Sequence, residues 1–196
     1  MPLNEISLAI SPYIARVGKA IQFYKNNVDK TKNSGLMLCI AEGPTGGWPL
    51  VNGDEVAPLP ELITTQLENI IGFKRYKNMY FVVANTAGDL SVGGITWQRI
   101  TAASDEDLYA EALNRGARWL YIEAELDTTE LEGEVYRQVG LYSEVKINTL
   151  VANPADSLFT PDKIIPNSGI LEVYQNKYPV LRPAELKEIF TWVLEF

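Results

Sequence analysis

The apolar residues of this chain fall into short runs that are separated by turn-forming residues, and this limits the folds open to it. The runs cover residues 36–41, 79–84, 95–100, 119–127, 135–147, 169–174 and 189–196. In the last run Phe190, Trp192 and Leu194 would share one face of a strand, because side chains two positions apart point the same way. Short runs of this kind, bounded by Gly, Pro and Asn, are typical of a mainly β chain.

Two segments have the spacing of amphipathic helices instead. Ser11 and Pro12 offer a capping hydroxyl and a proline for the first helical position. An apolar stripe then follows at spacings of three and four, through Ile14, Val17, Ile21 and Tyr24. A second helix is expected to open at Ser104, with a pattern like a capping box, and to end at Gly116. A third short helix is predicted within residues 60–72.

The run at 36–41 is apolar on both faces and is therefore expected in the centre of a sheet. Within 119–127, Trp119 and Tyr121 are expected on one face, and Leu120 and Ile122 on the other. No internal repeat and no linker divides the pattern. We predict an α+β, mainly β chain, with one structural domain over residues 1–196. Its core is expected to be an antiparallel β-sandwich with two or three short helices.

Two irregular segments interrupt the predicted elements. Residues 43–60 contain four glycines and four prolines, too many breakers for a regular element, and loops of this length are usually functional or pinned against a neighbour. Trp48 could anchor a partner, and the prolines reduce the entropy lost when a loop becomes ordered. The candidate interface residues are therefore Trp48, Pro49, Pro58 and Pro60. In the alternative interpretation, Trp48 covers the core of its own domain. The second segment is a polar, proline-bearing connector at 153–168.

The inventory of reactive side chains is small. The chain has no histidine, which removes nucleophiles activated by imidazole, imidazole metal sites and the usual general base near neutral pH. Its single cysteine, Cys39, cannot form an internal disulfide and is expected as a buried strand thiol. We accordingly assign no catalytic, cofactor-binding or metal-binding residue, no cofactor, and no enzymatic activity.

One alternative enzyme hypothesis remains, based on three carboxylates that alternate along a predicted strand. Glu123, Glu125 and Asp127 would share a face and could hold a divalent cation or act as an acid/base pair on cell-envelope glycan. A solvated strand face gives the same pattern, and we favour that interpretation.

The charge balance and the hydropathy pattern exclude two classes of partner. The formal net charge is −8, with no run rich in Lys or Arg, so nucleic acid is not expected as a partner. No apolar run approaches the ~20 residues that a membrane-spanning helix needs. The N-terminus lacks the pattern of a secretory signal, and we expect folding in a reducing cytoplasm.

Several segments are similar, in the same order, to the baseplate wedge subunit of T-even-type contractile-tailed bacteriophages. In the first half these are 22–26 (QFYKN), the strand at 36–41, Gly47-Trp48-Pro49 with the following prolines, and 72–75. The more specific matches are Tyr136-Arg137-Gln138-Val139, the stretch 168–180, and the closing stretch 188–196. The chain is considerably shorter than that subunit around residues 83–119, which puts contacts made by the subunit's central insertions in doubt.

The resemblance implies a virion structural protein, made in the host bacterial cytoplasm and placed in the tail baseplate. It implies a wedge subunit without enzymatic activity that links neighbouring wedge and fibre-attachment proteins, as a homodimer or in multiple copies. Residues 137–142 also resemble tail-collar fibre proteins, so a neck, collar or tail adaptor that fastens fibres is the alternative. For Arg137 we expect a role inside the chain, because aromatic and apolar residues surround it in the sequence.

Overall fold

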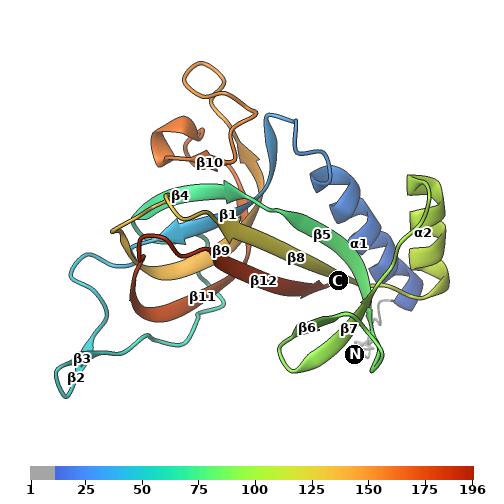
Figure 1. Cartoon of the computed structure of the whole chain (residues 1–196), viewed down its shortest axis with the longest axis horizontal. Helices are drawn as coiled ribbons and strands as arrows, with labels where there is room; N and C mark the ends of the chain where they lie inside the picture. The colour runs from blue at the N-terminus through green and yellow to red at the C-terminus, as the bar shows by residue number, and fades with distance from the viewer. Residues whose placement is uncertain (1–11) are drawn as a thin grey trace, which may run out of the picture. The chain divides into compact units, whose positions relative to one another are not determined.

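A computed structural model describes residues 12–196, and Ser11 of the expected helix cap lies outside them. In chain order the elements (Figure 1) are α1 (Tyr13–Asn27), β1 (Ser34–Ala41), β2 (Leu50–Val51), β3 (Asp54–Glu55), β4 (Ile70–Arg75), β5 (Asn78–Ala84), β6 (Leu90–Val92), β7 (Ile95–Arg99), α2 (Asp105–Asn114), β8 (Trp119–Leu126), β9 (Val135–Lys146), β10 (Leu158–Phe159), the 3-10 helix η1 (Pro161–Lys163), β11 (Ile170–Leu181) and β12 (Glu188–Glu195). The predicted class, mainly β with a sandwich-like antiparallel core and short helices, is confirmed.

The chain divides into two compact units, each built from segments that are distant in sequence. Of the described residues, unit 1 contains 12–24, 80–121 and 192–196, and unit 2 contains 25–79 and 122–191. The single domain expected over residues 1–196 stays a prediction.

Unit 2 is built on a five-stranded sheet in the order β10-β4-β1-β9-β11, with antiparallel neighbours throughout. β1 is central, as its two apolar faces predicted, and seven of its eight residues are buried. Met37 of β1 faces Arg75 of β4 on one side and Tyr142 of β9 on the other. Cys39 is fully buried in this strand, as expected.

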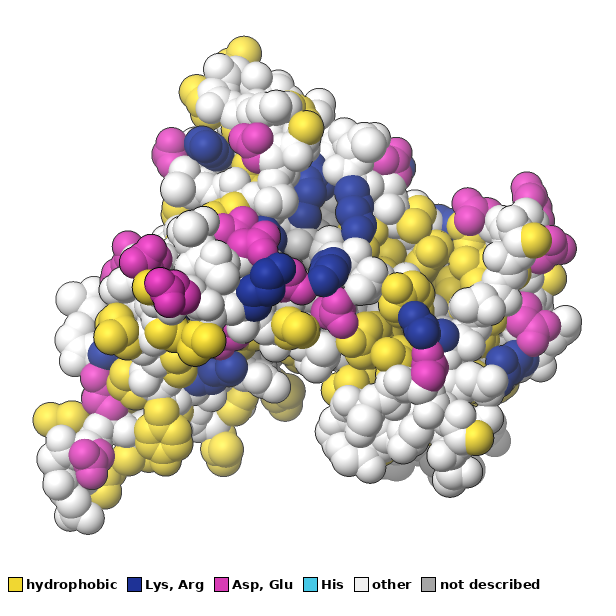
Figure 2. Space-filling model, viewed as in Figure 1, with side chains coloured by type: hydrophobic (Ala, Val, Ile, Leu, Met, Phe, Trp, Pro, Cys, Tyr) yellow, Lys and Arg dark blue, Asp and Glu magenta, His cyan; other side chains and the backbone are white. Residues whose placement is uncertain are grey.

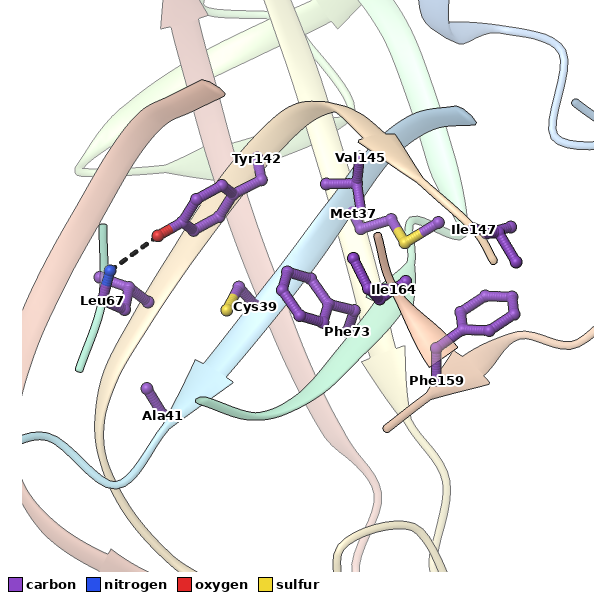
Figure 3. Close-up of a cluster of buried hydrophobic side chains, with 10 residues drawn as sticks. All are labelled: Met37, Cys39, Ala41, Leu67, Phe73, Tyr142, Val145, Ile147, Phe159 and Ile164. Atoms are coloured by element: carbon purple, nitrogen blue, oxygen red, sulfur yellow. Dashed lines mark hydrogen bonds between the residues drawn. The ribbon is translucent and has the colours of Figure 1, made fainter. Parts of the chain in front are cut away.

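The apolar core of unit 2 is shown in Figure 3, where side chains of β1, β4 and β9 meet those of the connector at 153–168. Phe73 and Tyr142 pack edge to face with ring centroids 6.1 Å apart. The hydroxyl of Tyr142 accepts a hydrogen bond of 2.7 Å from the backbone N–H of Leu67. The chain before β4 is thereby tied to the core by a buried polar contact.

Aromatic contacts in unit 1 join α1 to β5 and to Phe196. Tyr24 of α1 packs on Phe81 with centroids 4.8 Å apart, and Phe23 packs on Phe196 at 5.0 Å. Ser104 caps α2, as predicted, since its hydroxyl accepts from the backbone N–H of Asp107 at 3.2 Å. Within unit 1, strand β7 pairs with both β5 and β6, at one end of the second large sheet of the chain, whose order is β12-β8-β5-β7-β6.

Three sequence predictions about the elements require correction. Residues 60–72 form no helix, because hydrogen bonds to Tyr174 and Tyr142 hold Glu61 and Leu67 in an irregular path, and β4 begins at Ile70. Ile14 is exposed, although the rest of its stripe is buried. β11 extends seven residues beyond the predicted end at 174, with register shifts that accommodate Pro179 at the sheet edge.

The connector at 153–168 is also more ordered than its composition indicated. It contributes β10, which pairs with β4, and the single-turn helix η1. Among the described residues, no helix is both long and apolar enough to cross a membrane.

Candidate interaction surface

The loop at 43–60 contains a short hairpin that its glycines and prolines concealed. Leu50 pairs with Glu55 and Val51 with Asp54, and the turn between them is Asn52-Gly53. Both turn residues have positive φ, 56° and 95°, which matches the type I′ turn that two-residue hairpins favour. The Asn-Gly pair is the sequence signal for this hairpin. The many glycines and prolines around it led the sequence analysis to expect no regular element in this segment.

Glu55 holds the hairpin against the sheet of unit 2. Its two carboxylate oxygens accept hydrogen bonds of 2.6 Å from Nε and Nη2 of Arg137 on β9, and one oxygen also accepts from the backbone N–H of Trp48 at 2.9 Å. The Arg137 hydrogen bonds are the main cause that lowers the pKa of Glu55 to about 2. Arg137 therefore acts within the chain, as its sequence environment indicated.

A glycine at position 47 makes this arrangement possible. A Cβ at Gly47 would lie 2.7 Å from a carboxylate oxygen of Glu55, and Gly47 has a φ of +82°. Both the space and the backbone conformation favour glycine here.

Trp48 lies inside the chain and not on the surface of the loop. Its side chain is part of the core, with 6% of the residue exposed, and its Nε1 donates to the backbone oxygen of Lys177 on β11 at 2.7 Å. Pro49, Pro58 and Pro60 are exposed. The structure thus places Trp48 in the core and the three prolines at the surface. The interface role of these four residues stays a prediction.

Large apolar side chains are exposed along the same segment, which we call the 49–63 surface. Leu59, Leu62 and Ile63 are 87%, 106% and 82% exposed, and Leu50, Val51 and Val56 are also exposed. Figure 2 shows hydrophobic side chains gathered on the part of the view where Figure 1 places β2 and β3. The sequence analysis selected the prolines and missed these aliphatic residues.

Polar contacts fix the far end of the 49–63 surface. The Nδ2 of Asn176 on β11 donates to the backbone oxygen of Pro58 at 3.0 Å. The hydroxyl of Tyr174 accepts from the backbone N–H of Glu61 and lies 2.9 Å from the hydroxyl of Thr64. The exposed aliphatic side chains therefore extend from a backbone that is tied down at both ends, by Glu55 and by β11.

The three alternating carboxylates on β8 and just beyond it are paired with other groups of unit 2. Glu123 accepts from Nδ2 of Asn78 at 2.8 Å. Glu125 forms ion pairs with Lys77 and Lys187 at 2.5 and 2.9 Å, and Asp127 forms one with Lys187 at 3.0 Å. The hydrogen bonds from the two lysines lower the pKa of Glu125 to about 2.

These contacts do not suit Glu125 as the proton donor of an acid/base pair. A glycosidase needs a carboxylic acid with a raised pKa to protonate the leaving group, and the pKa of Glu125 is shifted in the opposite direction. Among residues 12–196, no group of three or more carboxylate or thiol side chains is placed to hold a metal ion. Glu125 is the least exposed of the paired groups, with 13% of its side chain exposed, so this part of the face is less open to solvent than the sequence analysis expected.

Two comparisons with known proteins found similarity to phage virion proteins. The model of the family described as "Baseplate wedge 3 tail fiber network component" matches residues 38–196. "Virion protein 3" of Enterococcus phage phiEF24C is 27% identical over 193 residues, which cover 96% of each chain. The family match includes the 49–63 surface, Arg137 and the strands of the unit 2 sheet, except the first four residues of β1.

Proposed function

The chain belongs to the baseplate wedge 3 tail fiber network component family, and from this premise we propose that it links neighbouring wedge proteins to fibre-attachment proteins through its 49–63 surface. It is a structural component of a phage baseplate and its tail fiber network. In the proposed role it is non-catalytic, present in several copies or as a homodimer, and mechanical in its action.

The observation that supports this role is the combination of exposed aliphatic side chains with a pinned backbone. Monomeric proteins rarely expose large contiguous apolar patches, and such patches usually mark interaction sites. The ion pair of Glu55 with Arg137 and the hydrogen bond from Trp48 to Lys177 order the segment before any partner binds. Binding then costs little further conformational entropy.

A pair of matched double variants tests the proposed surface. Replacing Leu59 and Leu62 by Ser removes two highly exposed apolar side chains from the 49–63 surface. Replacing Leu150 and Val151 by Ser makes the same chemical change at exposed positions in the turn after β9. Both variants should fold, because neither pair belongs to the core.

We expect the Leu59 and Leu62 variant to be depleted from assembled particles when it replaces the natural subunit in the phage, while the control is incorporated normally. Quantitative mass spectrometry of purified particles and the titre of infectious phage are the readouts. Normal incorporation of the folded Leu59 and Leu62 variant would overturn the proposed surface.

A separate measurement addresses the place of the chain on the particle. Gold-labelled antibody should mark the distal end of the tail in electron micrographs of intact and sheath-contracted particles. Label at the head–tail junction would favour the neck or collar adaptor instead. Absence of label on disrupted particles would reopen the enzyme hypothesis.

A further inference from the structure

A second feature of unit 2 lies apart from the 49–63 surface and plays no part in the proposed function. It is a cavity of about 730 Å³, lined by the chain after α1, by the end of β4 and by the connector that precedes β10. Its charged lining residues are Lys30, Lys74, Arg75, Lys77, Glu125 and Asp127. Figure 2 shows Lys and Arg side chains gathered around the hollow near the middle of the view.

Most of these charges are already neutralised within unit 2. Lys74 forms an ion pair with Glu130, and Lys77 forms one with Glu125. Lys187, beside the cavity, forms ion pairs with Glu125 and Asp127. Neither Lys30 nor Arg75 forms an ion pair with any residue in 12–196. Five cations and three carboxylates, counted over the lining and its ion-pair partners, leave an excess of two positive charges.

Arg75 lines the cavity, and its hydrogen bonds within the described chain leave some N–H donors of its guanidinium unused. It is 8% exposed, and its Nη2 donates to the backbone oxygens of Lys32 and Pro154, at 3.1 and 2.9 Å. Its Nε donates to the backbone oxygen of Asp156 at 3.3 Å. Its Nη1 makes no hydrogen bond within the described chain and is not among the atoms sealed from solvent there. An ordered guanidinium with an unused edge is suited to an oxyanion.

Lys30 provides the second charge of the site. Its Nζ lies 4.6 Å from the centre of the Tyr76 ring and donates to the backbone oxygen of Lys77 at 2.5 Å, which leaves donors for another acceptor. Burial is the main cause that lowers the pKa of Lys30, and repulsion by Arg75 is the next. Both cations line the same cavity, and an anion bound there by both would relieve that repulsion.

The carboxylate of Asp29 does not fill this place. It accepts hydrogen bonds from the backbone N–H and the hydroxyl of Thr31, at 2.9 and 2.7 Å, and forms no ion pair with Arg75. Its charge moderates the potential around Arg75 without reaching the unused edge.

We propose that this cavity is a docking pocket for an acidic side chain of a partner polypeptide, with Lys30 and the Nη1 edge of Arg75 binding its carboxylate. Two observations support this proposal. The first is the charge of the cavity, whose excess positive charge is complementary to a carboxylate and lies in a chain with a net charge of −8. The second is the size of the cavity. A lone inorganic ion would leave most of 730 Å³ empty, whereas a glutamate with its flanking residues would also cover Tyr76, Pro154 and Ala155.

The test uses the full chain and three probes at constant ionic strength. These are inorganic phosphate, a five-residue peptide with one glutamate between pairs of valines, and the same peptide with glutamine. Isothermal titration calorimetry measures binding to the natural protein, to Lys30→Gln and to Lys19→Gln. Lys19 is an exposed lysine of α1 that does not line the cavity, so its variant is the matched control.

We expect the glutamate peptide to bind at least about tenfold more tightly than either phosphate or the glutamine peptide. Lys30→Gln should weaken that binding about tenfold, because it removes one of the two charged donors, and Lys19→Gln should leave it unchanged. Equal affinity for phosphate and the glutamate peptide would overturn the assignment to an acidic side chain. Absence of binding by every probe would overturn the site itself. Neither result bears on assembly through the 49–63 surface.

Discussion

Arg137 on β9 and Glu55 on β3 form a two-bond ion pair, with Nε–Oε2 and Nη2–Oε1 distances of 2.6 Å, across 82 positions of sequence. The pair fixes an otherwise exposed hairpin to β9, an interior strand of the five-stranded sheet of unit 2. Because the guanidinium and the carboxylate meet edge to edge, the contact restrains orientation as well as distance. The presentation of the 49–63 surface depends on it.

This ion pair predicts a specific dependence of stability on pH. The pKa of Glu55 is lowered in the folded chain from 4.5 to about 2, so its contribution is complete above pH 4.5 and is lost as the pH falls toward 2. The difference in the free energy of unfolding between the natural protein and Glu55→Gln should therefore shrink over that range. Urea titrations at several pH values measure it. A difference that is constant or grows with acid would contradict the assignment.

The carboxylate face of β8 predicts that Glu125→Gln keeps its fold and its assembly. The substitution removes the charge that Lys77 and Lys187 share, and both lysines remain in contact with solvent. We expect a small decrease in the thermal unfolding temperature and normal incorporation into particles. Exclusion of the folded variant from particles, or the loss of a glycan-cleaving activity shown by the natural protein, would show that this face is functional.

The unit 2 core predicts a large cost for Phe159→Ala. Phe159 is fully buried with Phe73 and Ile164, and truncating an aromatic side chain in such a place costs about 3–5 kcal/mol. Tyr178→Ala is the control, because Tyr178 is largely exposed and its loss should change stability by no more than about 0.5 kcal/mol. Chemical denaturation measures both variants. Similar values for the two would contradict the packing described here.

The last five residues are predicted to be part of the unit 1 fold. Trp192 is buried, Phe196 packs on Phe23, and Glu195 pairs with Arg16 and Arg118. Deleting 192–196 should abolish the cooperative folding of unit 1, since the loss of one buried aromatic alone costs about 3–5 kcal/mol. Glu195→Gln should leave the fold intact. A truncated chain with an unchanged cooperative thermal transition would identify these residues as an external arm.

The sequence by itself determined most of the secondary structure. The double-sided apolar run placed β1 at the centre of its sheet, alternation assigned the two faces of β8, and Ser104 marked the start of α2. These features depend on residues within one turn or one strand of each other. Local sterics, capping and periodicity are properties of short windows, and a sequence displays them directly.

Only the tertiary structure decided where the irregular segments lie and which side chains they expose. Ile63 and Leu67 had the spacing of a helix, but the Tyr142 hydroxyl binds the backbone at Leu67 while Ile63 stays in solvent. Trp48 is buried, and its indole N–H donates to a backbone carbonyl oxygen 129 positions away in the sequence. The cavity around Lys30 and Arg75 likewise joins segments that are distant in sequence. Such contacts depend on which groups the complete chain brings together, and no local pattern records that.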